Sequence, residues 1–150
     1  MPDQEINRGI FAGLVKAIDW YDNSLQNLLA SRGLKVVNRT QAMMLVHIAS
    51  GNTRPSAIAR KMRLSRQNIH AMAKVLIGAQ LIVLNPDPMD GRAGCYALSE
   101  DASGQRDAAL EILGFLEGRL ADRIGKDTVR ELNRALAADW GEPITKMFVD

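Results

Sequence analysis

The stretch PSAIARKMRLSRQNIHAMAKVL, residues 55–76, decides the fold. Pro55 suits the first turn of a short helix, because its fixed φ is already helical and the N–H that it lacks would be unpaired there. Ser65 is a favourable N-cap for a second helix. Ala59 is small where the two helices must cross, and four apolar side chains can fill the wedge between them: Ile58, Leu64, Ile69 and Leu76. Two helices joined by a turn at residues 63–65 predict a helix-turn-helix motif.

The second helix of such a motif places its N-terminal turn in the DNA major groove, and here that turn reads SRQN, residues 65–68. Gln and Asn side chains can pair bidentately with adenine, and Arg with guanine. Arg66 opposes the helix dipole, at a cost of about 0.3–1 kcal/mol, and a phosphate from outside would complement that dipole. His70 and Lys74 follow on the same exposed side. His70 is interpreted as a groove-facing residue, and a plain exposed histidine is the alternative.

The distribution of charge indicates the same kind of partner. Residues 23–86 contain no Asp or Glu, whereas residues 1–22 and 87–150 carry net charges of −2 and −5. The total of +2 therefore hides a middle segment of charge +9, which is typical of a surface that binds a polyanion. Chance clustering on a solvated face is the alternative. The side chains predicted to contact phosphates are Arg54, Arg60, Lys61 and Arg63.

Further helices and a hairpin surround the motif. Apolar residues at spacings of three and four predict long helices over residues 6–31 and 101–124, and a shorter helix over 128–138. Asn38 can cap another helix, and the runs 81–84 and 94–99 are typical of strands. The predicted fold is mainly α with a small β-hairpin wing. The long helices carry more apolar surface than one small core needs, so we expect a second copy of the chain to cover them.

The segment between the two strands, NPDPMDGRAGC at residues 85–95, has two interpretations. Its aspartates suggest a cation-binding loop, whereas its prolines and glycines suggest the tip of a hairpin. Met89 stands two residues after Asp87, where a calcium loop needs another acidic ligand, and no later Glu closes such a site at the required distance. The segment is therefore predicted to be a hairpin tip, in which Gly91 and Gly94 allow tight turning and Arg92 is directed outward.

Residues 54–102 resemble the MarR family of winged helix-turn-helix regulators. Two stretches carry the resemblance, IARKMRLSRQNIHAMAKVL at 58–76 and, above all, DPMDGRAGCYALS at 87–99. The second stretch matches the family's wing signature at Asp87, Pro88, Asp90, Arg92, Leu98 and Ser99. The order of the helices extends the resemblance to the whole chain. The sequence departs from the family pattern at Ala71, Gln80, Gly91 and Ala102. Gln80 stands in place of the usual glycine after the recognition helix, which predicts a junction that is either strained or differently shaped.

The resemblance implies an obligate homodimer, with a winged helix-turn-helix DNA-binding domain at residues 36–99 and a helical dimerisation region at residues 1–35 and 100–150. It implies that Arg92 enters the minor groove and that Asp90 helps to orient the wing arginines. It also implies that the recognition helix presents five side chains to the major groove: Ser65, Arg66, Gln67, Asn68 and His70.

Many members of that family bind a small, often aromatic, anion as an effector between the dimer helices and the winged domain. The side chains available to line such a pocket here are Trp20, Tyr21, Met43, Met44 and His47. Apolar residues at helical spacing also fit simple core packing, which is the alternative. Cys95 is interpreted as a packed or incidentally exposed thiol rather than a redox sensor, because the chain has no second cysteine.

Several classes of function are excluded on composition and motifs. No nucleophile elbow, phosphate-binding glycine loop or Ser/His/Asp grouping supports catalysis. Two histidines and one cysteine do not make a zinc site. We expect no enzyme activity, no metal and no cofactor. The first residues, MPDQEINRG, lack a secretory signal, and no apolar run approaches the ~20 residues of a bilayer span. The protein is therefore expected to be cytoplasmic, with no membrane partner.

The function predicted from these features is a homodimeric, sequence-specific transcriptional regulator. It is expected to bind a pseudo-palindromic operator in double-stranded DNA and to act as a repressor that a small-molecule effector relieves. The alternative is a winged-helix protein-interaction module without DNA binding.

Overall fold

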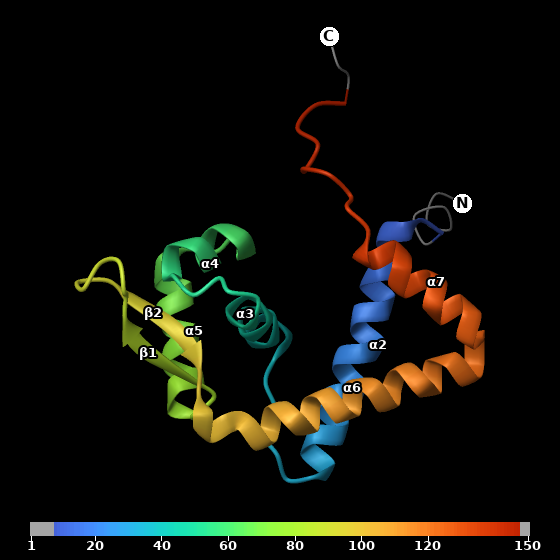
Figure 1. Ribbon diagram of the computed structural model, residues 1–150, viewed down its shortest axis with the longest axis horizontal. Coiled ribbons are helices and arrows are strands. Elements are labelled where there is room, and N and C mark those ends of the chain that lie inside the picture. The colour runs from blue at the N-terminus through green and yellow to red at the C-terminus, as the bar shows by residue number, and fades with distance from the viewer. Residues whose placement is uncertain (1–7, 148–150) are drawn as a thin grey trace. The chain divides into compact units, whose positions relative to one another are not determined.

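The computed structural model describes residues 8–147 and confirms the predicted fold class, mainly helical with a two-stranded antiparallel wing. Figure 1 shows the elements, which are α2 (Ile10–Ser31), α3 (Arg39–Ala49), α4 (Pro55–Met62), α5 (Arg66–Gly78), β1 (Ile82–Pro86), β2 (Gly94–Leu98), the 3-10 turn η1 (Glu100–Ala102), α6 (Ser103–Ile124) and α7 (Lys126–Ala137). Their order is the one predicted from the sequence. Residues 6 and 7, the expected start of the first helix, lie outside the described residues. None of the helices within residues 8–147 has the length and apolar character needed to cross a membrane.

The predicted capping residues stand at the helix starts. The Ser65 side-chain oxygen accepts a hydrogen bond from the Asn68 backbone N–H at 3.1 Å, and Pro55 is the first residue of α4. Asn38 caps α3 by accepting from the Gln41 N–H at 2.9 Å, and the Gln41 side chain accepts in turn from the Asn38 N–H at 3.0 Å. This reciprocal capping box satisfies two backbone N–H groups at the helix start, which explains why α3 begins where it does.

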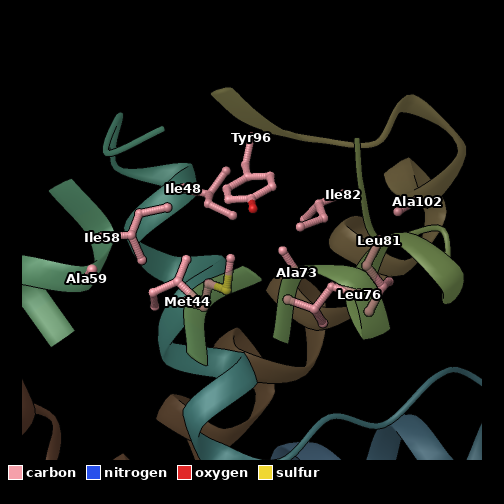
Figure 2. Packing of buried hydrophobic residues seen from close by; sticks show 11 residues of the cluster. Met44, Ile48, Ile58, Ala59, Ala73, Leu76, Leu81, Ile82, Tyr96 and Ala102 are labelled. Atoms are coloured by element: carbon pink, nitrogen blue, oxygen red, sulfur yellow. The ribbon is translucent and has the colours of Figure 1, made fainter. Parts of the chain in front are cut away.

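The core lies between the helix-turn-helix motif and the wing (Figure 2). Helices α3, α4 and α5, the hairpin and η1 contribute its buried side chains: Met44, Ile48, Ile58, Ala59, Ile69, Ala73, Leu76, Leu81, Ile82, Tyr96 and Ala102. Each fully buried large apolar side chain stabilises the fold by about 1.5–3 kcal/mol. Ala59 is 6% exposed, and its small side chain lets α4 approach α5, as its size predicted. In Figure 2 the Tyr96 ring reaches into the cluster between Ile48 and Ile82.

The wing is an antiparallel hairpin of β1 and β2. Its turn is closed by the Asp87 N–H, which donates to the Ala93 carbonyl at 2.8 Å. Gly94 faces Leu84 so closely that a Cβ atom at position 94 would lie 2.5 Å from Leu84 Cδ1. The predicted hairpin is confirmed, but its turn is only residues 87–93, because residues 85 and 86 pair with residues 95 and 94 as the ends of the two strands. Within residues 8–147, no group of three or more His, Cys, Asp or Glu side chains is placed to hold a metal ion.

Two non-glycine residues adopt left-handed backbone conformations where the helices of the motif end. Arg63 has φ +55° after α4, and Gln80 has φ +62° after α5. An L-residue in this region costs about 1–2 kcal/mol, which confirms the strained junction predicted at Gln80. Leu81, the next residue, is buried, and β1 begins at Ile82, one residue later than predicted.

The chain divides by its contacts into two compact units, Met1–Leu113 and Gly114–Asp150, with the boundary inside α6. In the second unit Val129 of α7 is buried, and the Asn133 side chain donates to the Glu117 carboxylate at 2.9 Å. This division into two units reflects only how densely the residues pack against one another. The functional division between a DNA-binding domain and a dimerisation region stays a prediction.

Candidate nucleic-acid interface

The N-terminal turn of α5 presents polar side chains to solvent. Arg66, Gln67 and Asn68 are exposed, and their side chains make no hydrogen bond or ion pair within residues 8–147. The first turn contains no acidic residue, so no carboxylate in it offsets the positive end of the helix dipole. Three side chains that can bond to base edges are thus available at the electropositive end of the helix.

The cations near this turn are unpaired as well. Arg60, Lys61 and Arg63 are exposed, and in the described part of the chain their side chains contact no carboxylate; the same holds for Lys74 on α5. Several arginines outside the motif do pair with carboxylates, as in Arg32–Glu111, Arg39–Asp19 and Arg134–Glu131. The motif therefore keeps its positive charge available for an external anion, in line with the segregation of charge in the sequence.

Arg54 differs from the other predicted phosphate contacts, because its guanidinium is bound within the protein. Its Nε lies 2.7 Å from Oδ2 of Asp87, and its Nη2 lies 3.2 Å from Oδ1. Only 3% of the Asp87 side chain is exposed, and it also accepts from the Met89 N–H at 2.9 Å. These contacts, the Met89 N–H first and the Arg54 guanidinium second, hold the pKa of Asp87 below its ordinary value.

This ion pair connects the wing to the motif, because Arg54 is the N-cap residue of α4 and Asp87 immediately follows β1. Sequence reasoning missed the pairing, since 33 positions separate the two residues. One signal was present: Asp87 is the first acidic residue after the acid-free segment. In the free protein the Arg54 guanidinium therefore links the start of α4 to the base of the wing.

At the wing tip Arg92 is exposed, and its guanidinium is unpaired within the described residues. The Asp90 carboxylate accepts from the Arg92 backbone N–H at 3.1 Å, and the Asp90 carbonyl accepts from the Ala93 N–H at 3.0 Å. Asp90 thus shapes the turn that carries Arg92, through backbone bonds rather than through the guanidinium. Figure 1 shows this turn extending beyond the strands.

His70 is exposed on α5, and its Nδ1 lies 3.0 Å from the hydroxyl of Tyr96 on β2. Sequence reasoning did not identify Tyr96 as a site residue, because the alternating pattern of β2 shows only which face of the strand it is on. Burial raises the pKa of the Tyr96 hydroxyl above its ordinary value. His70 also lines a depression of about 260 Å³ between the motif and the wing, together with Arg54, Arg66 and Asp87.

The five residues predicted for an effector pocket have different environments. The Trp20 and Tyr21 rings meet edge to face, with centroids 4.9 Å apart. Met43 is exposed, and His47 is half-buried. Met44 has no exposed surface and belongs to the core cluster. For this residue the alternative of simple core packing is therefore the correct one. A pocket that involves the other four residues stays a prediction.

Comparison with known proteins agrees with this geometry. Residues 37–93 match the model of the MarR family. The transcriptional repressor CouR, solved bound to a 23-mer DNA duplex, is 22% identical with a TM-score of 0.66, over 89% of this chain and 93% of CouR. The reduced form of MarR from E. coli is 17% identical with a TM-score of 0.67, over 85% of this chain and 93% of that chain. A mutant of S. aureus MepR bound to an oligodeoxyribonucleotide is 14% identical with a TM-score of 0.56, over 86% of this chain and 94% of that chain. No curated protein matches the sequence.

The fold and the exposed motif define a winged helix-turn-helix protein. The matched segment contains α3, α4, α5, β1 and the turn of the wing, which supply most of the core residues and the whole candidate interface. Residues 37–93, the winged helix-turn-helix part of the chain, match the MarR family, and the chain shares its fold with CouR and E. coli MarR. This match confirms the resemblance to the MarR family that the helix-turn-helix and wing residues carried.

Proposed function

We propose that the protein is a homodimeric, sequence-specific repressor that binds a pseudo-palindromic operator in double-stranded DNA. The observation that carries this proposal is the unpaired, acid-free surface at the start of α5, where Arg66, Gln67 and Asn68 are exposed. A polar helix end surrounded by uncompensated cations suits a polyanion whose base edges accept and donate hydrogen bonds. The structures of CouR bound to a DNA duplex and of a MepR mutant bound to an oligodeoxyribonucleotide support the same function.

Each part of this surface has a separate task. The first turn of α5, capped by Ser65, enters the major groove, where Gln67 and Asn68 suit adenine and Arg66 suits guanine. Arg92 on the wing tip reaches the neighbouring minor groove. Phosphates are contacted by the unpaired cations Arg60, Lys61, Arg63 and Lys74, while Arg54 adds charge at the base of the wing without leaving Asp87.

The dimer is proposed from apolar side chains that the described chain leaves uncovered. On α2, Ile10 and Phe11 are 77% and 82% exposed. In the second unit Leu136, Trp140 and Ile144 are also exposed. Exposed apolar surface of this kind marks a contact with another protein surface. A second copy bound through residues 1–35 and 100–150 would give the two-fold symmetry that a pseudo-palindrome requires, with half-sites about 10 bp apart.

The most specific part of the proposed function is regulation by a small-molecule effector. A small aromatic anion would bind near Trp20, Tyr21, Met43 and His47 and lower the affinity for the operator. The Trp20–Tyr21 ring pair offers an aromatic surface, and rings stack favourably on rings. Titration of aromatic carboxylates, followed by Trp20 fluorescence and by release of labelled DNA, tests it. A Trp20→Phe variant separates the Trp20 signal from that of Trp140, and no release by any compound would remove the effector from the proposal.

The function itself is tested by selecting fragments of the host genome with the purified protein and measuring their binding by fluorescence anisotropy. Enrichment of a pseudo-palindromic sequence is expected. The Arg66→Ala/Arg92→Ala double variant should lose affinity while it keeps the wild-type unfolding curve. If no fragment is enriched, or if the double variant binds as tightly as the wild type, DNA recognition by this surface is wrong. The protein-interaction alternative would then stand.

A further inference from the structure

His70 and Tyr96 join the recognition helix to the buried face of the wing. The two residues are 26 positions apart, and His70 Nδ1 lies 3.0 Å from the Tyr96 hydroxyl. Tyr96 is only 2% exposed, and its ring is held among the apolar side chains shown in Figure 2. One partner is therefore fixed by the core, while the other is on the surface that carries the candidate interface.

The position of the shared proton follows from the surroundings of the hydroxyl. Burial raises the pKa of Tyr96, so the hydroxyl keeps its proton at neutral pH. Within residues 8–147 that hydroxyl has no hydrogen-bond partner other than His70. A buried donor left unpaired is costly, so Tyr96 donates to Nδ1. A neutral imidazole that accepts at Nδ1 carries its own proton on Nε2.

We propose that Tyr96 is a positioning residue that holds neutral His70 as the Nε2–H tautomer and directs this single donor at an acceptor on a base edge in the major groove. This inference rests on the proposed function. Nδ1 and Nε2 flank the same ring carbon, and their in-plane bonding directions diverge strongly, so with Nδ1 bonded to the buried Tyr96 hydroxyl the Nε2–H points away from that hydroxyl. The acceptors of matching chemistry are the N7 atom of a purine, the O6 atom of guanine and the O4 atom of thymine.

The side chains around His70 are charged, and a donor held in one direction adds a selectivity for bases that a flexible charge does not provide. Arg66 lies about one turn before His70 on α5, Lys74 lies about one turn after it, and Arg54 and Asp87 share the depression with it. The lysine ammonium is a mobile point charge on a flexible stem, which adds affinity with little choice of base. A donor held in one direction by the core discriminates more strongly, because the wrong base leaves its hydrogen bond unmade.

The tautomer is tested without DNA. Nitrogen-15 NMR of the imidazoles at pH 8 distinguishes the two tautomers by the shifts of Nδ1 and Nε2, and the His70→Ala variant identifies the His70 signals. The wild type should show the Nε2–H form almost alone, and Tyr96→Phe, which removes one oxygen and keeps the ring, should show a mixture. A dominant Nδ1–H form, or no change in Tyr96→Phe, overturns the inference whatever the protein does with DNA.

The role of the pair in DNA binding is tested by a double-mutant cycle, in which the affinity of each variant for the selected operator is measured. Tyr96→Phe should weaken binding about three- to tenfold, as the loss of one hydrogen bond predicts, and should reduce the preference at one base pair of each half-site. In a His70→Ala background the same change should have no further effect. Additive losses overturn the inference. A wild-type protein that enriches no DNA contradicts the proposed function instead, while the tautomer measurement still decides the role of Tyr96.

Discussion

Replacing Lys61 with glutamine should change how DNA binding depends on salt, by an amount that follows from the structure. Lys61 is exposed on α4 and unpaired in the described chain, so the variant removes one charge and no internal contact. Each phosphate contact contributes about 0.9 to the slope of log K against log salt concentration. A dimer loses two contacts, so the slope should become shallower by about 1.8. The ratio of wild-type to variant affinity should then fall by about twelvefold between 50 mM and 200 mM salt.

The assay is fluorescence anisotropy of a labelled operator at four or more salt concentrations. Two variants serve as matched controls. Lys126→Gln removes the same charge from α7, outside the motif and the wing, and should leave the slope unchanged. Gln67→Ala removes a base contact without a charge, so it should reduce the preference for the operator over random DNA at an unchanged slope. A slope change below about 0.5 for Lys61→Gln, or an equal change for Lys126→Gln, would refute counterion release from this surface.

Three further predictions concern the parts that hold the interface in place. Ser65→Ala removes the cap of α5 and should lower the free energy of unfolding by about 1 kcal/mol; equal urea midpoints for variant and wild type would contradict it. Gln80→Gly relieves the left-handed residue after α5 and should raise that free energy by about 0.5–1 kcal/mol, which the same urea assay measures. The lowered pKa of Asp87 means that its contribution to stability is fully present above the ordinary carboxyl pKa and is lost as the pH falls through the lowered value. Asp87→Asn should therefore be less stable than the wild type by a constant amount from about pH 7 to pH 5, with the gap closing below about pH 4. A gap that is unchanged at pH 3 would mean that the Asp87 carboxylate does not anchor the wing.

Much of the fold was predictable because its determinants are local. The caps at Asn38 and Ser65 act on backbone N–H groups two or three residues away, and Pro55 acts on its own φ. The spacing of apolar residues records which side of each helix is buried. The segregation of charge is visible in the sequence itself, so the basic segment can be recognised without the structure. The hairpin tip was also predictable from local chemistry, because Met89 stands where a calcium loop needs an acidic ligand.

The sequence by itself therefore determined the order of the elements, the starts of α3, α4 and α5, and the segregation of positive charge from which we infer the DNA contacts. The tertiary structure decided which of the predicted site residues have a partner within the protein and which are exposed to solvent. Arg54 is held by Asp87 across 33 positions, His70 is held by Tyr96 across 26, and Met44 is fully buried in the core. These pairings depend on how α4, α5 and the hairpin pack, and no local pattern encodes such packing, because the partners meet only after the chain has folded.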